Sequence, residues 1–173
     1  YVGPRPYERG DAYKFYGRNR EARDLLALLL AERVVLFYAK SGAGKTSLLN
    51  AQVIPALEKE GVRVLPVARV SSDVPPGIAP DTVGNVFVFS VLMALAGVNA
   101  SPAQLRTATL ATILQALYKR PDSDSEGDAP FLLIVDQFEE LFITHRDRWQ
   151  DAEGFFIQMR DALEALPGMG VLF

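Results

Sequence analysis

The stretch that decides the fold is VVLFYAKSGAGKT, residues 34–46. It begins with a continuously apolar run, Val34–Phe37, which is typical of a parallel strand covered on both faces. Two glycines, Gly42 and Gly44, follow closely, and a helical pattern then extends from Lys45 to Glu60. The order of strand, glycine-rich loop and helix predicts a βα unit of an α/β fold.

The loop Ala39–Thr46 has the composition of a phosphate cradle. Its glycines allow backbone conformations that turn successive N–H groups toward phosphate oxygens, and the following helix adds its positive N-terminal end. Lys45 is placed to reach the β and γ phosphates, and the hydroxyl of Thr46 to bind Mg²⁺. The candidate nucleotide-binding residues of the loop are Ser41, Gly42, Ala43, Gly44, Lys45, Thr46 and Ser47. The loop starts with alanine where such loops usually have glycine, and the alternative interpretation is a glycine-rich turn that caps a helix.

Composition excludes several classes of function. The 173 residues are 49% hydrophobic and 23% charged, which is enough apolar material for a folded core and predicts one domain. A formal net charge of -3 gives no general attraction to nucleic acid or to anionic membranes, so we expect neither as a direct partner. The chain has no cysteine, which excludes disulfides, thiol catalysis and cysteine-ligated zinc and fits a cytoplasmic location. The longest apolar stretch, Val86–Val98, is shorter than the roughly 20 residues that span a bilayer, and predicts a buried helix.

Helical and strand patterns alternate along the chain. Predicted helices cover residues 19–32, 45–60, 86–96, 101–119 and 149–166, and predicted strands cover residues 33–38, 62–70 and 131–135. Residues 120–130 contain four acidic residues with Pro, Ser and Gly, which indicates a solvated loop. A last strand begins near residue 170, so we expect the core to be truncated here and to continue beyond Phe173. The alternation predicts a three-layer α/β fold in which helices cover both faces of a parallel sheet.

A cluster of acids follows the predicted strand at residues 131–135. Asp136 comes directly after this strand, where a carboxylate can hold the water shell of Mg²⁺ beside the phosphate loop. An acid about one turn later can activate the attacking water, and Glu139 and Glu140 are both candidates. The alternative for either glutamate is a surface acid that complements a helix dipole. The candidate catalytic residues are therefore Lys45, Glu139 and Glu140, and the candidate metal-side residues are Thr46 and Asp136.

Three stretches resemble the signal-transduction ATPases with numerous domains, the STAND class, and in particular its novel STAND NTPase branch. Residues Tyr1–Tyr7, YVGPRPY, resemble the opening motif of that branch, with Pro4 where leucine is more usual. Phe15–Arg18, FYGR, is similar to its box before the first helix, although Asn19 replaces the glutamate that commonly follows. Residues Asp136–Phe142, DQFEELF, carry the most specific match. With the phosphate loop, these stretches span most of the chain.

The resemblance implies a P-loop NTPase core of the additional-strand catalytic-Glu type. The strand beginning near Val171 would then insert between the phosphate-loop strand and the Asp136 strand. The resemblance also places Tyr16, Gly17 and Arg18, in the box before the first helix, beside the adenine. The alternative is that the aromatic residues of this box only fix the N-terminal arm to the core. Residues 1–18 would form that arm and the adenine-side box, and residues 19–173 the NTPase core.

The function that the resemblance implies is a molecular switch that binds ATP or ADP with Mg²⁺ and hydrolyses ATP slowly. It implies partners as well: a homo-oligomer in the activated state, and fused effector and sensor domains, commonly in prokaryotic antiphage defence or programmed cell death. Three alternatives stay open. They are an AAA+-type remodelling motor, a DNA-loading ATPase and a scaffold in which the nucleotide is structural and never cleaved.

Overall fold

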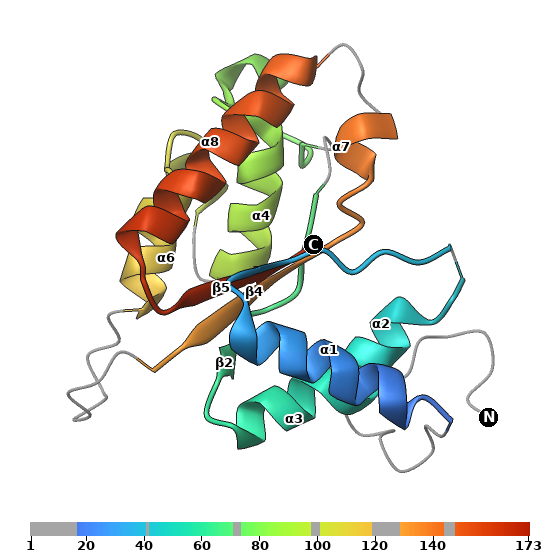
Figure 1. Ribbon diagram of the computed structural model, residues 1–173. Coiled ribbons are helices and arrows are strands. Elements are labelled where there is room, and N and C mark those ends of the chain that lie inside the picture. The colour runs from blue at the N-terminus through green and yellow to red at the C-terminus, as the bar shows by residue number, and fades with distance from the viewer. Residues whose placement is uncertain (1–16, 41, 71–73, 98–100, 119–128, 144–147) are drawn as a thin grey trace.

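The computed structural model describes residues 17–40, 42–70, 74–97, 101–118, 129–143 and 148–173. A parallel sheet lies in the middle, with α1–α3 on one face and α4, α6 and α8 on the other (Figure 1). This is the three-layer α/β fold that the alternation of patterns predicts. The predicted N-terminal arm, Tyr16, Ser41 and most of the predicted loop at residues 120–130 lie outside the described residues.

The strand order places the phosphate-loop strand and the acid-bearing strand on either side of the last strand. β1 (Val34–Val35), β5 (Met169–Leu172), β4 (Phe131–Asp136) and β2 (Arg63–Val64) lie side by side in that order, and β3 (Ala68–Arg69) pairs with the end of β4. Every described pairing is parallel. The insertion of β5 between β1 and β4 confirms the strand order expected from the family resemblance.

One face of the sheet is covered by α1 (Asn19–Ala31) and by the helix that follows the phosphate loop. That helix runs through α2 (Lys45–Leu48), a π-helical segment (Leu49–Val53) and α3 (Ile54–Lys59), so the predicted helix at residues 45–60 is confirmed, with a π-helical turn inside it. Its apolar residues pack on the side chains of Leu132, Ile134 and Leu172. This packing fixes the start of α2, and with it the phosphate loop, against the carboxyl end of β4.

The other face carries the larger core. It is covered by α4 (Val86–Ala96), α6 (Leu110–Tyr118) and α8 (Trp149–Ala165). Residues 131, 133 and 135 of β4 point into this core, while residues 132 and 134 point to the opposite one. β4 is therefore buried on both sides, as its continuously apolar sequence predicts. Within the described residues, no helix is both long and apolar enough to cross a membrane.

β1 departs from the prediction because it lies at the edge of the sheet. Val35 is buried, but Val34 and Leu36 are 54% and 68% exposed, so the expectation of a strand covered on both faces is wrong. The core cluster on the α8 side extends as far as Val171 of β5, which is the register partner of Val34. An apolar run in the sequence does not show which strand of the finished sheet lies at its edge.

Two predicted elements are interrupted. The helix predicted at residues 101–119 is split into α5 (Pro102–Leu105) and α6. Between the two helices, the carbonyl of Arg106 accepts a hydrogen bond from Gly84 N instead of from a residue of the same helix. The strand predicted at residues 62–70 is split into β2 and β3. Pro66 lies between them, and proline has no N–H to donate to a neighbouring strand.

The end of α8 is held by the side chain of Arg33, the residue just before β1. The guanidinium of Arg33 donates to the carbonyls of Leu163, Leu166 and Met169, at 2.5, 2.9 and 3.2 Å. The carbonyls of Leu163 and Leu166 lie at the end of α8, where helix carbonyls lack partners within the helix, and Met169 is the first residue of β5. The backbone carbonyl of Arg33 also accepts from Val171 N at 2.8 Å, so one residue joins α8 to the β1–β5 pair.

Candidate functional site

The phosphate loop has the backbone shape that its glycines permit. Gly42 and Gly44 both have φ of +76°, a conformation that residues with a side chain rarely adopt. Between them, Ala43 N donates to the carbonyl of Lys40 at 3.1 Å, which closes the turn. Ala39 does not need this freedom, since Gln137 alone has a positive φ among the described residues other than glycine. The alanine at the start of the loop is therefore compatible with the loop's conformation.

Lys45 and Thr46 open α2 directly after the loop. The ammonium of Lys45 donates to the carbonyl of Ala39 at 3.2 Å, across the mouth of the loop. The Thr46 hydroxyl lies 3.4 Å from Oδ2 of Asp136 and donates to it. These two oxygens come from residues 90 positions apart in the chain, and the sheet brings them together as the sequence predicts. Ser47 follows as the next residue of α2.

The carboxylate of Asp136 is fixed by the tight turn after β4. Gln137 has φ of +60°, and its N–H donates to Oδ1 of Asp136 at 3.0 Å. This bond leaves Oδ2 facing Thr46. The side chain of Asp136 is only 13% exposed, and Nε of Arg69 lies 3.9 Å from the same Oδ2. One oxygen of the Asp136 carboxylate is thus bound by a backbone N–H, and the other faces both Thr46 and Arg69.

The same turn separates the two glutamates. Glu140 N donates to the carbonyl of Gln137, and Phe142 N donates to that of Glu139, so the chain advances in three-residue steps. With three residues per turn, the residue at position i+3 from Asp136 returns to its side. Glu139 accordingly lines the pocket together with Lys45 and Asp136, whereas Glu140 begins α7 (Glu140–Ile143) and does not line it.

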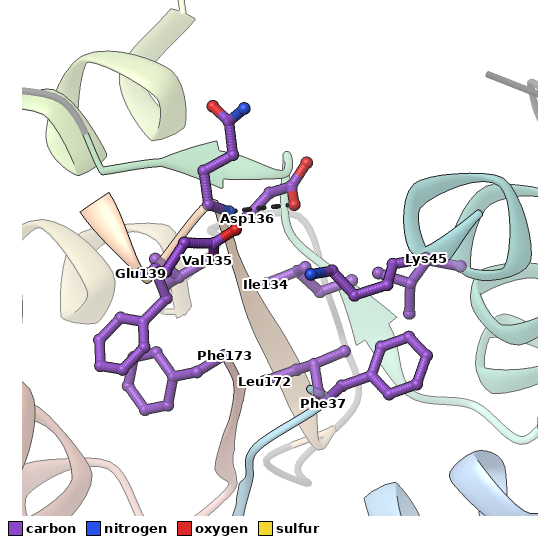
Figure 2. A pocket seen from close by; sticks show the side chains of 11 residues that line it. Phe37, Lys45, Ile134, Val135, Asp136, Glu139, Leu172 and Phe173 are labelled. Atoms are coloured by element: carbon purple, nitrogen blue, oxygen red, sulfur yellow. Dashed lines mark hydrogen bonds between the residues drawn. The ribbon is translucent and has the colours of Figure 1, made fainter. Parts of the chain in front are cut away.

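The pocket between these groups is small and has an apolar floor. It has room for about 30 Å³, enough for one or two water molecules, and the side chains of Phe37, Ile134, Leu172 and Phe173 lie below the polar groups. Figure 2 shows Lys45 reaching in from α2 toward the end of β4, with Asp136 above and the rings of Phe37 and Phe173 on either side. Charged groups therefore meet here over a largely dehydrated base, where electrostatic interactions are stronger than in water.

Arg18, the last residue of the box before α1, lies against the phosphate loop. Arg18 is the residue before the first turn of α1, and its guanidinium donates to the carbonyl of Ala43 at 2.6 Å while it also pairs with Glu21 at 3.5 Å. Gly17 has φ of +89° and is exposed. Of the three candidate adenine-side residues, the structure thus brings Arg18 beside the loop. Their contact with a base stays a prediction.

Two residues of the site were missed by the sequence reasoning. Arg69 belongs to no recognisable motif. Its position near the end of the predicted strand at residues 62–70 could have indicated that it lies near Asp136, because parallel strands end at one edge of a sheet. Gln137 was read only as part of the acidic stretch. Its role in orienting Asp136 depends on a left-handed backbone conformation that side-chain types do not reveal.

The residues present fit a nucleotide with Mg²⁺. Mg²⁺ takes oxygen ligands, usually one or two carboxylates with waters and phosphates, and Thr46 and Asp136 offer two oxygens 3.4 Å apart. The left-handed glycines and the N-terminus of the helix after the loop suit phosphate, and Lys45 adds a fixed positive charge. The donor set therefore matches a phosphate chain on one side and a hard cation on the other.

A parallel sheet between helix layers, a glycine loop after one strand and an acid at the end of another together define the class of P-loop NTPases. The sequence comparison is more specific. The chain belongs to the family described as novel STAND NTPase 1, whose model matches residues 1–169. No curated protein and no solved structure matches the chain significantly.

Proposed function

We propose that this domain is an ATP/ADP-binding switch that hydrolyses ATP slowly with Mg²⁺. The observation that carries the proposal is the meeting of Thr46 and Asp136, 3.4 Å apart, at the mouth of a loop whose glycines have left-handed backbone. Membership of the STAND NTPase family supports a nucleotide-dependent switch over a continuous motor.

Each residue has a defined part in the proposed reaction. Mg²⁺, when bound, would neutralise charge on the phosphate chain. The ammonium of Lys45 leaves the carbonyl of Ala39 and binds the terminal phosphates. The hydroxyl oxygen of Thr46 would be a ligand of Mg²⁺. Asp136, held by Gln137 N, orients the water shell on that side. Glu139 accepts the proton of the attacking water because it is the glutamate that lines the pocket.

The experiment that tests the switch compares the rate of ATP hydrolysis in a single turnover with the rate in the steady state. We expect stoichiometric binding of ATP and a steady-state rate well below the 1 to 10³ per second that is common for enzymes. Turnover within that range would favour a remodelling motor instead. Recovery of intact ATP after prolonged incubation would favour the scaffold, in which the nucleotide is structural.

The wider role is part of the same proposal. Family membership supports a larger signalling protein in which the nucleotide state controls homo-oligomerisation, with effector and sensor domains and a role in prokaryotic defence. The measurement is the mass of the intact protein in solution with a non-hydrolysable ATP analogue and with ADP. An assembly that forms with the analogue and not with ADP supports it, and equal masses under all conditions contradict it.

A further inference from the structure

Arg69 lies at the metal side of the site, and its position is fixed by two separate contacts of its backbone. It ends β3, where it is the register partner of Asp136 on the neighbouring strand β4. Its carbonyl accepts a hydrogen bond from the hydroxyl of Ser90 on α4 at 2.7 Å. The root of the side chain is therefore held against the residue that is placed to orient Mg²⁺.

The guanidinium of Arg69 approaches one particular oxygen. Nε lies 3.9 Å from Oδ2 of Asp136, and the hydroxyl of Thr46 lies 3.4 Å from that same oxygen. The other oxygen, Oδ1, is taken by the N–H of Gln137. The arginine thus pairs with the oxygen that faces the metal side, although its own side chain is 63% exposed and free to turn away.

Two other cations beside the loop, Lys45 and Arg18, have different partners. Lys45 donates to the carbonyl of Ala39, and Arg18 binds the carbonyl of Ala43 and Glu21. Among the described ion pairs, Arg69 is the cation that neutralises Asp136. A carboxylate that already has a cationic partner attracts a second cation less strongly, because the fixed charge repels it and shares the same oxygen.

We propose that Arg69 is a built-in counter-cation that competes with Mg²⁺ for Asp136 and so sets the Mg²⁺ concentration at which the domain holds its nucleotide. This inference rests on the proposed nucleotide-binding function. In the site without Mg²⁺, the guanidinium of Arg69 neutralises the charge of Asp136. With Mg²⁺ and a nucleotide bound, the exposed guanidinium of Arg69 would leave Oδ2 of Asp136, and that oxygen would hold the water shell of the metal.

The competition predicts an unusual direction of change. Most substitutions near a metal site weaken metal binding, but Arg69→Gln removes the competitor and leaves Asp136 in place. Exposed ion pairs contribute roughly 0.2–1 kcal/mol, so the Mg²⁺ concentration at half-maximal nucleotide binding should fall by about 1.4- to fivefold. Arg69→Lys retains the positive charge and should keep a midpoint close to that of the parent.

The experiment is a Mg²⁺ titration of the purified chain with a fluorescent ATP analogue at fixed concentration, starting from excess chelator. The matched control is Arg160→Gln on α8, because Arg160 has a similarly exposed side chain, at 64%, and pairs with Asp161 away from the pocket. We expect a lower midpoint for Arg69→Gln only. An unchanged or raised midpoint for Arg69→Gln, or an equal fall in the control, would overturn the proposal.

A second pair of variants tests whether the effect passes through Asp136. In an Asp136→Asn background, Arg69→Gln should no longer move the midpoint, because the shared carboxylate charge is gone. The same shift in both backgrounds would mean that Arg69 acts on the phosphates directly, which contradicts the competition. If the Asn variant binds no analogue, the difference between Arg69→Gln and Arg69→Lys decides.

Different results would contradict the proposed nucleotide-binding function and the proposed role of Arg69. A parent chain that binds no analogue at any Mg²⁺ concentration contradicts the proposed function itself. A parent that binds with a clear Mg²⁺ midpoint, which Arg69→Gln leaves in place, contradicts only the role of Arg69. Parent binding that is indifferent to Mg²⁺ also overturns that role, since there is then no competition to relieve.

Discussion

Replacement of Arg33 by methionine should destabilise the fold by an amount that the structure allows us to work out. Methionine keeps a long apolar stem but loses three hydrogen bonds, two to the end of α8 and one to the start of β5. Hydrogen bonds from charged groups contribute about 1.5–3 kcal/mol each, yet these three share one guanidinium and partly exposed carbonyls that water can reach. We therefore expect the free energy of unfolding to fall by about 2 kcal/mol in total. This figure includes the loss of the favourable positive charge at the C-terminal end of the helix.

The measurement is urea unfolding of parent and variant followed by circular dichroism, with calorimetry for the melting temperature. For a domain of this size, a loss of about 2 kcal/mol lowers the melting temperature by roughly 4–8 °C. The control is Arg160→Met, on α8, whose ion pairs are exposed to solvent, so we expect its free energy of unfolding to stay close to that of the parent. Equal stability of the two variants would refute the argument, because the cap would then contribute no more than an ordinary surface arginine.

Further predictions concern the site and the core. Glu139→Gln should leave ATP binding within about twofold of the parent and lower single-turnover hydrolysis by about 10²–10⁴, while Glu140→Gln stays within about tenfold; the opposite pattern would assign the base to Glu140. Arg18→Met should weaken ATP binding about fivefold through the lost bond to Ala43, and a similar loss in the exposed control Arg20→Met would contradict this. Phe155→Ala should cost about 3–5 kcal/mol in urea unfolding, since Phe155 is fully buried, and a cost below about 1.5 kcal/mol would show that the core around it collapses freely.

The sequence predicted the elements whose signals are local. The helix over residues 86–96 was predicted with both ends correct, because Asn85 caps it through a bond from Val88 N and Gly97 follows it. β4 was predicted to within one residue, since both of its faces are buried and its apolar run ends at a charge. Lys45, Thr46 and Asp136 were likewise placed together, because motif spacing and strand polarity alone bring them to one edge.

The features that depend on tertiary contacts were not predictable in the same way. The exposure of Val34 and Leu36 follows from the place of β1 in the sheet, which distant segments decide. The break between α5 and α6 depends on the bond from Gly84 N to Arg106. The choice between Glu139 and Glu140 was left open because it depends on the turn at Gln137.

The most direct test of the account is calorimetric titration of ATP with Mg²⁺ into the parent chain, Lys45→Ala and Lys59→Ala. Lys45 lines the pocket, whereas Lys59 lies exposed in the last turn of α3 and serves as a matched loss of charge. The account predicts one site in the parent, the same affinity in Lys59→Ala and no detectable binding in a folded Lys45→Ala variant. ATP affinity in Lys45→Ala equal to that of the parent would contradict the assignment of the phosphate loop, and with it the switch.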